Sequence, residues 1–310
     1  MNKILTIAIP TYNRINDLQK CISCILKNID SNEVELLVSD NCSTDGTKKY
    51  MESIIQDNDF INYYRNDENL GADQNFLNCI NKASSKYIWL IGDDDFVLNQ
   101  SINNIIDILK NNPDFLFINP KNDVNPKKEV EIVTDINLFM QKMNINITFM
   151  TSLIFNSKYL KKIDKKEKYI GTSFLQSHLA LLTLKDGNKY YIKNTPTIKP
   201  SPNLKIGYDL YSVWFKNYHD LLYITAREAG INSDISDEVF ISSMKNQIIR
   251  FVFQFRITCR KADKTWNKHL ALDLLKHNYG HLYRYFYVPI KCPAFLLRII
   301  RRIYIKMKWM

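Results

Sequence analysis

The pattern of apolar and polar positions divides the chain into a first half that alternates between strand and helix and a last part that is helical. Short apolar runs rich in β-branched and aromatic residues predict strands at residues 4–9, 34–39, 61–64, 87–91 and 115–118. Apolar residues spaced three and four apart predict helices between them, at residues 17–26, 47–55, 72–83 and 102–109. This alternation is typical of an α/β fold, in which a parallel sheet carries helices on both faces.

The pattern weakens at residues 120–146, where Asn, Lys and Asp gather around Pro126 and predict a solvated loop or hairpin. Beyond this segment we expect a strand at 147–155, a helix at 173–184, and a small hairpin formed by 190–193 and 196–199. After a Pro-rich stretch at residues 200–202, helical spacing returns at 213–228, 238–260 and 269–285. The sequence therefore predicts two parts, an α/β domain of residues 1–205 and a helical region of residues 206–310.

The composition of the 310 residues, 45% hydrophobic and 24% charged, is that of a folded protein. No uninterrupted apolar stretch approaches the ~20 residues of a membrane span. The chain begins with a strand-like run and not with a signal peptide, and its six cysteines are therefore expected to be reduced thiols. We expect a cytoplasmic protein, or one held peripherally on the cytoplasmic face of a membrane.

The formal charge of +10 is unevenly distributed. Residues 246–310 hold 14 Lys and Arg against Asp263 and Asp273, a net charge of +12. The remaining 245 residues hold 28 basic and 30 acidic side chains, a net charge of −2. The asymmetry indicates an anionic surface as a partner of the C-terminal region.

The C-terminal residues 295–310 have the spacing of a basic amphipathic helix. At ~100° per residue, one side carries Arg298, Arg301, Arg302, Lys306 and Lys308, and the other carries Leu296, Ile299, Ile300, Ile303, Tyr304 and Met307. Such a helix is typical of binding to an anionic membrane surface, where each cation contributes roughly 1 kcal/mol. The alternative is a helix whose apolar side packs on the protein. A nucleic-acid-binding protein is disfavoured, because no recognised motif accompanies the charge.

Candidate chemistry begins where the apolar run 87–91 ends in Gly92 and three consecutive acids, Asp93, Asp94 and Asp95. Like charges a few Å apart raise one another's pKa, and a cation removes that cost. Mg²⁺ and Mn²⁺ bind carboxylate oxygens and complete their shells with substrate phosphates. Open α/β sheets place their ligands at the carboxyl ends of the strands. The cluster therefore predicts a metal–diphosphate site; the alternative is an acidic turn that caps the next helix.

Two further strand ends carry polar residues. The first strand runs into Pro10, Thr11, Asn13 and Arg14, and it lacks both the dinucleotide-binding and the P-loop glycine patterns. Asp40 follows the second strand directly, as does an acid that binds ribose or base at a strand end. Asp45-Gly46 is also ordinary turn chemistry. Asn75, on the predicted helix 72–83, is a candidate for fixing a phosphate or base.

Taken in order, these segments resemble the family 2 glycosyltransferases, which have a GT-A fold. The resemblance covers about the first 100 residues and is strongest to enzymes that build bacterial O-antigen, capsule or other surface glycans. It implies a Rossmann-like mixed or parallel sheet with flanking helices, a UDP-sugar donor, a glycan or lipid-linked glycan acceptor, and Mn²⁺ or Mg²⁺. It also implies a nucleotide pocket lined by Pro10, Thr11, Asn13 and Arg14, with Asp40 at the base or its ribose and Asp45 near it. Asn75 and Asp94 are further candidates for binding the nucleotide. Asp93 and Asp95, the first and last acids of the family's Asp-x-Asp motif, would contact the ribose and the metal, and Asp95 is a catalytic candidate through that metal.

The sequence departs from the family where the general base is expected. Residues 171–178 match the region in which family members carry an acid pair, and they contain no carboxylate. His178 is the nearest titratable group, and imidazole is a legitimate base; a buried structural histidine is the alternative. Asp209 is a weaker candidate. A sugar-phosphate nucleotidyltransferase shares the α/β layout and the metal–diphosphate requirement, but the glycine-rich N-terminal loop of that class is absent.

Overall fold

The computed structural model describes residues 3–29, 32–121, 126–200, 207–259 and 261–308, and of residues 262 and 303–308 it describes the backbone alone. The chain divides into two compact units. Unit 1 comprises residues 1–203 and 225–231, and unit 2 comprises residues 204–224 and 232–310. The predicted boundary between residues 205 and 206 lies outside the described residues, as does part of the Pro-rich stretch, so that boundary stays a prediction.

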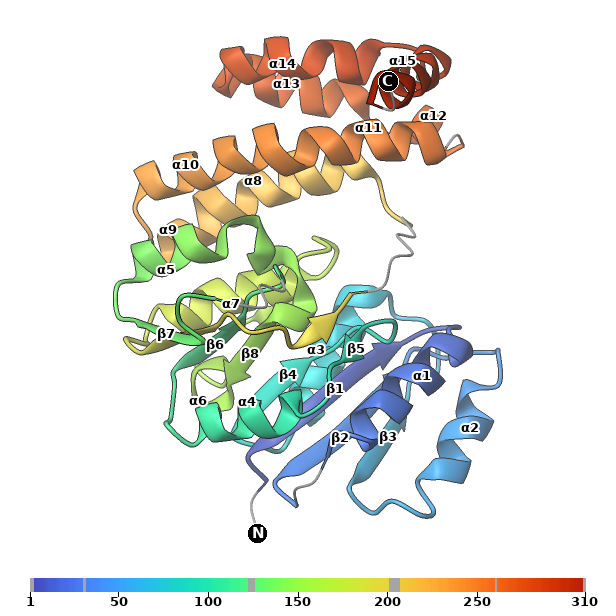
Figure 1. The fold of residues 1–310 in the computed structure, drawn as a ribbon, viewed down its shortest axis with the longest axis vertical. Coiled ribbons are helices and arrows are strands. Elements are labelled where there is room, and N and C mark those ends of the chain that lie inside the picture. The colour runs from blue at the N-terminus through green and yellow to red at the C-terminus, as the bar shows by residue number, and fades with distance from the viewer. Residues whose placement is uncertain (1–2, 30–31, 122–125, 201–206, 260, 309–310) are drawn as a thin grey trace. The chain divides into compact units, whose positions relative to one another are not determined.

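The described part of unit 1 contains an eight-stranded mixed sheet and a two-stranded antiparallel ribbon (Figure 1). The order across the sheet is β3-β2-β1-β4-β8-β6-β9-β7. Its strands are β1 (Leu5–Thr11), β2 (Val34–Asp40), β3 (Ile61–Arg65), β4 (Tyr87–Leu90), β6 (Phe115–Ile118), β7 (Val130–Val133), β8 (Leu153–Asn156) and β9 (Tyr190–Lys193). The ribbon pairs β5 (Phe96–Val97) with β10 (Ile198–Lys199).

The directions of the strands place the carboxyl ends of most of them at one edge of this sheet. β1 pairs in parallel with both β2 and β4, and β2 pairs in parallel with β3. β8 lies antiparallel between β4 and β6, whereas β9 is parallel to β6. The carboxyl ends of β1, β2, β3, β4, β6 and β9 therefore share one edge, here called the carboxyl edge, with the amino end of β8.

Helices cover both faces of the sheet, as predicted (Figure 1). They are α1 (Ile15–Leu26), α2 (Thr47–Ile54), α3 (Ala72–Lys82), α4 (Ser101–Leu109), α5 (Ile136–Met143), α6 (Ser157–Leu160), α7 (Leu175–Leu184) and α9 (Ala226–Glu228). Buried residues of α1, α2 and α4 form one core with Leu36 and Val38 of β2. Ser39 points to the opposite face, because strand side chains alternate, and it bonds Asn75 of α3 there.

The predicted strands and helices up to residue 118 are confirmed, with ends that differ by about two residues at most. The predicted strand 147–155 is wrong in its first half, where 3₁₀ segments Asn144–Thr148 and Met150–Ser152 precede β8. The predicted hairpin is also wrong, because β9 pairs with β6 and β7 while β10 pairs with β5. Residues 120–146 contain β7 and α5, and the Asp135 side chain caps α5 by accepting from Leu138 N. Periodicity identifies a buried face but not the partner strand.

Unit 2 is helical in its described residues. Its α-helices are α8 (Tyr218–Asp220), α10 (Ser233–Ser243), α11 (Ile249–Thr258), α12 (Ala262–Thr265), α13 (Lys268–Asn278), α14 (Gly280–Lys291) and α15 (Ala294–Lys308). π-Helical segments continue these helices: Ser212–Asn217, Leu221–Thr225 and Met244–Ile248. The last residue of the second segment, Thr225, is the first residue of the stretch 225–231 that belongs to unit 1. The single helix predicted at 269–285 is two helices, because Tyr279 leaves helical geometry between α13 and α14. Among the described residues, no helix has both the length and the apolar character needed to cross a membrane.

Arg256 is the polar centre of unit 2. Its side chain is 2% exposed, and its Nε lies 2.7 Å from Asp263 Oδ1. Its Nη1 donates to the carbonyl oxygens of Pro289 and Cys292, at the end of α14. One guanidinium therefore joins α11, α12 and α14, and it satisfies two main-chain acceptors that helix geometry leaves open.

We expect Arg256→Met to destabilise unit 2 by about 3–5 kcal/mol, because it leaves the Asp263 carboxylate buried without its guanidinium partner. Lys268, whose Nζ lies 3.2 Å from Asp263, places the loss toward the lower end of that range. Urea unfolding measures the change in the free energy of unfolding, and hydrogen exchange of segments 249–258 and 280–291 shows whether the loss lies in these helices. Arg250→Met, on the exposed side of α11, is the matched control. Equal stability of the two variants would contradict the assignment.

Candidate active site

The ends of β1 and β4 meet at the carboxyl edge through Asp93. Thr11 Oγ1 donates to Asp93 Oδ2 at 2.8 Å, and Arg14 Nη1 lies 3.0 Å from Asp93 Oδ1. The same guanidinium nitrogen lies 3.2 Å from Asp94 Oδ2. Thr11, Arg14, Asp93 and Asp94 are thus brought together as the sequence predicts. The pairing follows from register, because the parallel neighbours β1 and β4 end side by side.

The electrostatics of Asp93 leave room for further positive charge. Burial raises the pKa of Asp93 to about 6, against the lowering effects of the Arg14 cation and the Thr11 hydrogen bond. One guanidinium shared between Asp93 and Asp94 therefore does not offset the burial of this carboxyl. A bound cation would stabilise its ionised form.

Asp95 is oriented by a residue that the sequence analysis missed, Thr151. Asp95 is 5% exposed, and its Oδ2 accepts a hydrogen bond from Thr151 Oγ1. The same hydroxyl oxygen accepts from Gly92 N at 3.1 Å. A Cβ at Gly92 would lie 3.0 Å from Asp95 Oδ2, so glycine allows this close approach. Thr151 lies inside the segment predicted as a strand, and no motif singles it out.

The acid cluster has the donor chemistry of a magnesium or manganese site. Asp93 and Asp95 are buried, whereas the Asp94 side chain is 26% exposed and pairs with Arg14. The described residues contain no group of three or more metal-binding side chains. Two carboxylates are nevertheless sufficient for Mg²⁺ or Mn²⁺ when substrate phosphates and water complete the shell. The residues present therefore fit such an ion bound together with a diphosphate.

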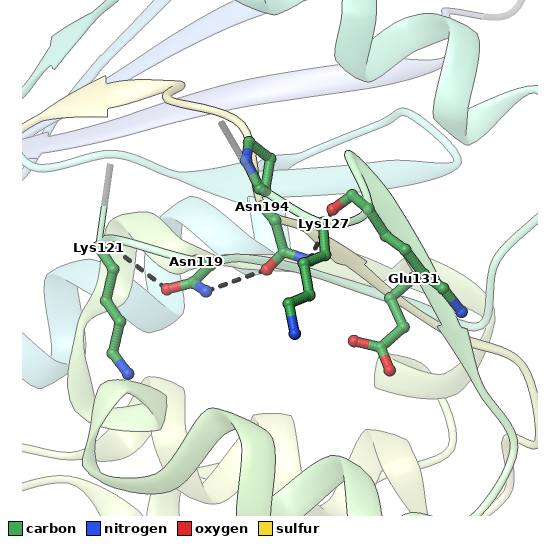
Figure 2. Close-up of a pocket in the computed structure, with 7 residues that line it drawn as sticks. Asn119, Lys121, Lys127, Glu131 and Asn194 are labelled. Atoms are coloured by element: carbon green, nitrogen blue, oxygen red, sulfur yellow. Dashed lines mark hydrogen bonds between the residues drawn. The ribbon is translucent and has the colours of Figure 1, made fainter. Parts of the chain in front are cut away.

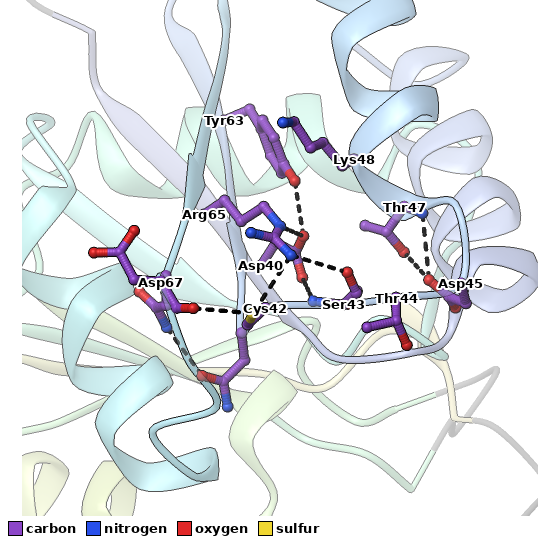
Figure 3. A network of polar contacts seen from close by, with 12 residues as sticks. Asp40, Cys42, Ser43, Thr44, Asp45, Thr47, Lys48, Tyr63, Arg65 and Asp67 are labelled. Carbon is purple, nitrogen blue, oxygen red and sulfur yellow. Dashed lines mark hydrogen bonds and ion pairs between the residues drawn. The ribbon is translucent and has the colours of Figure 1, made fainter.

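Asp40, at the end of β2, is the centre of a second polar network (Figure 3). It is 0% exposed, and its carboxylate accepts from Ser43 N at 2.8 Å and from the Tyr63 hydroxyl at 2.7 Å. Arg65 Nε lies 3.5 Å from the same carboxylate. Burial, then the hydrogen bond to Asp40, raises the pKa of Tyr63, which therefore stays a donor. Asp40 is held in one orientation by its own strand end and by β3.

Asn13 and Asp45 join the loops that follow β1 and β2. Asn13, with a positive φ of 51°, accepts from Thr44 N at 2.7 Å through its side-chain oxygen. Asp45 accepts from Thr47 Oγ1 at 2.7 Å and from Ile15 N, at the start of α1, at 2.8 Å. These bonds therefore hold the loops after β1 and β2 against each other.

Three residues of the predicted site, Pro10, Asn75 and His178, make contacts with other parts of the protein. Pro10 lies within β1. Asn75 is 2% exposed and exchanges hydrogen bonds with Ser39, beneath Asp40. His178 is 3% exposed inside α7, its Nδ1 lies 2.8 Å from Thr225 Oγ1, and its ring stacks on Tyr169 with centroids 4.3 Å apart. Their roles in binding and catalysis stay predictions.

Asp209, the weaker base candidate, lies in unit 2 and caps the π-helical segment Ser212–Asn217. Its carboxylate accepts from Tyr211 N at 2.9 Å, from Ser212 Oγ at 3.0 Å and from Asn267 N at 2.9 Å. These bonds give the side chain a structural role in that unit.

The segment 171–178, which lacks a carboxylate of its own, is held by one from α3. Asp73 Oδ2 accepts from Gly171 N at 2.8 Å and from Ser173 N at 2.9 Å. Gly171 and Ser173 both have positive φ, 88° and 62°, so the carboxylate stabilises an unusual turn. Burial raises the pKa of Asp73, and the backbone hydrogen bonds oppose that shift. Sequence reasoning missed Asp73, because an acid in the first turn of a helix normally serves its own helix.

A hollow of about 620 Å³ lies farther along the carboxyl edge, at the ends of β6 and β9 (Figure 2). Asn119 Nδ2 donates to Asn194 Oδ1 at 3.0 Å within its lining. The Glu131 carboxylate of the lining pairs with Lys142 at 2.9 Å. The remaining charges of the lining are three lysines, so the hollow is cationic: Lys121, Lys127 and Lys128.

The mixed sheet, its flanking helices and its helical continuation define a GT-A fold followed by a helical region. The chain belongs to glycosyl transferase family 2, whose family model matches residues 6–185. The resemblance drawn from the strand-end motifs is thereby confirmed.

Two relatives illustrate the family. An abequosyltransferase of Salmonella typhimurium is 28% identical over 193 residues, which cover 55% of this chain and 58% of the relative. A GalNAc(5)-diNAcBac-PP-undecaprenol beta-1,3-glucosyltransferase of Campylobacter jejuni is 32% identical over 103 residues, 33% of either chain. The matches thus span about half or less of these relatives.

Two solved structures share the fold at low identity. TarS of S. aureus, residues 1–349 in complex with UDP-GlcNAc, superposes with a TM-score of 0.62 at 13% identity and 91% coverage of both chains. A mannosyltransferase of Pyrobaculum calidifontis in complex with GDP-Man and Mn²⁺ superposes with a TM-score of 0.52 at 14% identity, covering 99% of this chain and 88% of that one.

We expect Thr151→Val to lower the apparent affinity for Mn²⁺ about 10–100-fold, because it removes the hydroxyl that orients Asp95. Thr151→Ser keeps the hydroxyl and is expected to restore most of the affinity. Isothermal titration calorimetry with Mn²⁺, in the presence of a nucleotide donor, measures the Mn²⁺ affinity of both variants. Wild-type affinity in the valine variant would show that Thr151 does not set the orientation of Asp95.

Proposed function

We propose that the protein is a metal-dependent glycosyltransferase that moves a sugar from a UDP-sugar to a lipid-linked glycan in bacterial surface polysaccharide synthesis. The observation that carries the proposal is the pair of buried carboxyls, Asp93 and Asp95, at the edge that also carries Asp40; Asp93 pairs with Arg14, and Asp95 accepts from Thr151. The relatives support it, since one is an abequosyltransferase and the other acts, by its name, on an undecaprenol diphosphate-linked glycan.

The donor would extend along the carboxyl edge from Asp40 to the acid cluster. β1 lies between β2 and β4, so the two sites are two strand spacings, about 10 Å, apart. A nucleoside diphosphate bridges such a span, with its base or ribose at Asp40 and its diphosphate at Asp93 and Asp95. TarS was solved with UDP-GlcNAc and the mannosyltransferase with GDP-Man; TarS superposes with the higher TM-score, 0.62 against 0.52, and therefore supports a uridine nucleotide for this chain.

Asp93 and Asp95 would hold Mn²⁺ or Mg²⁺, as their donor chemistry allows. A bound ion would supply Lewis-acid stabilisation of the charge that develops on the leaving diphosphate. The protein's own contribution is preorganisation. Thr11 and Thr151 fix the two carboxyls, and Arg14 places a permanent positive charge beside Asp93. The Mn²⁺ in the solved mannosyltransferase supports this assignment.

The acceptor would lie toward the cationic hollow. Its lysines favour an acceptor that carries phosphate, as a lipid diphosphate does. β6 is two strands from β4, so the hollow begins about 10 Å from the acid cluster along the same edge. A lipid-linked acceptor also implies a location on the cytoplasmic face of a membrane.

The test of the proposal combines donor binding with Asp95→Asn. A UDP-sugar at ~100 times its Kd is expected to stabilise the wild-type protein by about 2.7 kcal/mol in the presence of Mn²⁺. Asp95→Asn is expected to lose the Mn²⁺-dependent part of that stabilisation and to abolish transfer, because a neutral amide does not replace an anionic ligand. A thermal-shift series with UDP-, GDP-, dTDP- and CDP-sugars, followed by a transfer assay, measures both.

Asp107→Asn, an exposed residue of α4 with a side chain 76% exposed, is the matched control and is expected to behave as wild type. An active, metal-independent Asp95→Asn enzyme would overturn the proposal. Release of pyrophosphate from a nucleoside triphosphate and a sugar phosphate would instead identify a nucleotidyltransferase.

His178 is our proposed general base, since the reaction requires a group that takes the proton of the acceptor hydroxyl. His178→Asn is expected to lower kcat at least 10²-fold while the KM for the donor stays unchanged. The control is Thr225→Val, which removes the partner of Nδ1 and keeps the imidazole. If both variants lose activity only in proportion to lost folded protein, the histidine is structural and the base is another group.

A further inference from the structure

The terminal helix α15 turns an apolar side outward. Four large apolar side chains of its first two turns are between 39% and 59% exposed. They recur at intervals of one, three and four residues, which places them on one side of the helix. This group, here called the α15 strip, consists of Phe295, Leu296, Ile299 and Ile300.

Different residues hold α15 to unit 2. Leu297 is 1% exposed, and Arg298 Nε donates to the carbonyl oxygen of Ile257, at 3.4 Å. Ile257 belongs to α11, against which α15 packs (Figure 1). The helix is therefore anchored by Leu297 and Arg298, and the strip remains exposed in the described part of the chain. In the described first two turns, the apolar side predicted from the sequence therefore does not pack on unit 2.

The charged residues nearest the strip in the chain, before and after it, are all basic. Arg301 and Arg302 follow it and are exposed, and Arg284 and Lys291 are exposed on α14. The 37 residues that follow Asp273 contain no Asp or Glu. A second copy of the chain docked on the strip would bring these cations together, which like-charge repulsion opposes. An anionic surface complements them.

We propose that the α15 strip inserts at the headgroup level of an anionic phospholipid bilayer, with Arg301 and Arg302 near the lipid phosphates. An amphipathic helix binds such a surface through its buried apolar area together with its cations. The proposal goes beyond the transferase function, because it rests on the geometry of unit 2 alone and is measured without donor or acceptor.

The experiment is co-sedimentation of the full chain with vesicles of phosphatidylglycerol and phosphatidylcholine, and with vesicles of phosphatidylcholine alone. The wild-type chain is expected to bind the anionic vesicles and to be released by salt, which screens exposed charges. Ile299→Ser is expected to weaken binding about tenfold, because it removes one apolar side chain from the buried set. Arg301→Gln with Arg302→Gln is expected to weaken binding to anionic vesicles by a comparable factor.

A matched control distinguishes binding through the α15 strip from nonspecific binding of exposed apolar side chains to vesicles. Ile132→Ser replaces an isoleucine of unit 1 that is 55% exposed, against 47% for Ile299, and is expected to bind as wild type. Far-UV circular dichroism confirms that each variant folds. The proposal is overturned if the wild-type chain does not bind anionic vesicles, or if the two serine variants bind equally. It is also overturned if analytical ultracentrifugation shows an oligomer that Ile299→Ser dissociates, since a second copy would then cover the strip.

Discussion

The pairing of Arg14 with the acids at the end of β4 is the interaction on which the site depends. Asp93 is buried, and a buried carboxylate is costly unless it is paired and hydrogen-bonded. Arg14 and Thr11 supply that pairing from the next strand, yet the pKa of Asp93 stays raised to about 6 by burial. The fold thus concentrates negative charge where one guanidinium is insufficient, and this incomplete compensation makes the edge suited to a cation and an anionic ligand bound together.

Main-chain register delivers the groups that meet there. Thr11 pairs with Asp40 across β1 and β2, and β1 pairs with β4 on its other side. A slip of one residue would turn each of these side chains to the opposite face of the sheet. The loops beyond the strands are then fixed to one another, since Asn13 binds Thr44 and Asp45 binds the first amide of α1. These bonds fix, relative to one another, the loops that are proposed to bind the donor.

The sequence predicts which strand ends meet at this edge, because the information needed for that is local. Strand-length apolar runs end directly in Thr11, Asp40 and Asp93, and parallel strands bring such ends to one edge. The residues that were missed act over long separations: Thr151 bonds Asp95 across 56 residues, and Asp73 reaches Gly171 across 98. Hydrophobic periodicity tells which face of an element is buried, but it does not name the partner. For the same reason the strand predicted at 147–155 is longer than β8, and the hairpin predicted between 190–193 and 196–199 does not form.

The contrast between the two halves of the edge bears on specificity. The strand ends proposed to bind the donor belong to neighbouring parallel strands, whereas the hollow proposed for the acceptor is lined by residues that follow β6 and β9 and by lysines without a carboxylate partner among the described contacts. Loops placed on a rigid scaffold change more readily than the scaffold itself. Asp73 shows that a segment without a carboxylate of its own can be held by one from a neighbouring helix, α3. If the proposal holds, the choice of acceptor should therefore depend on the described residues that line the cationic hollow, and the choice of donor nucleotide on the strand ends.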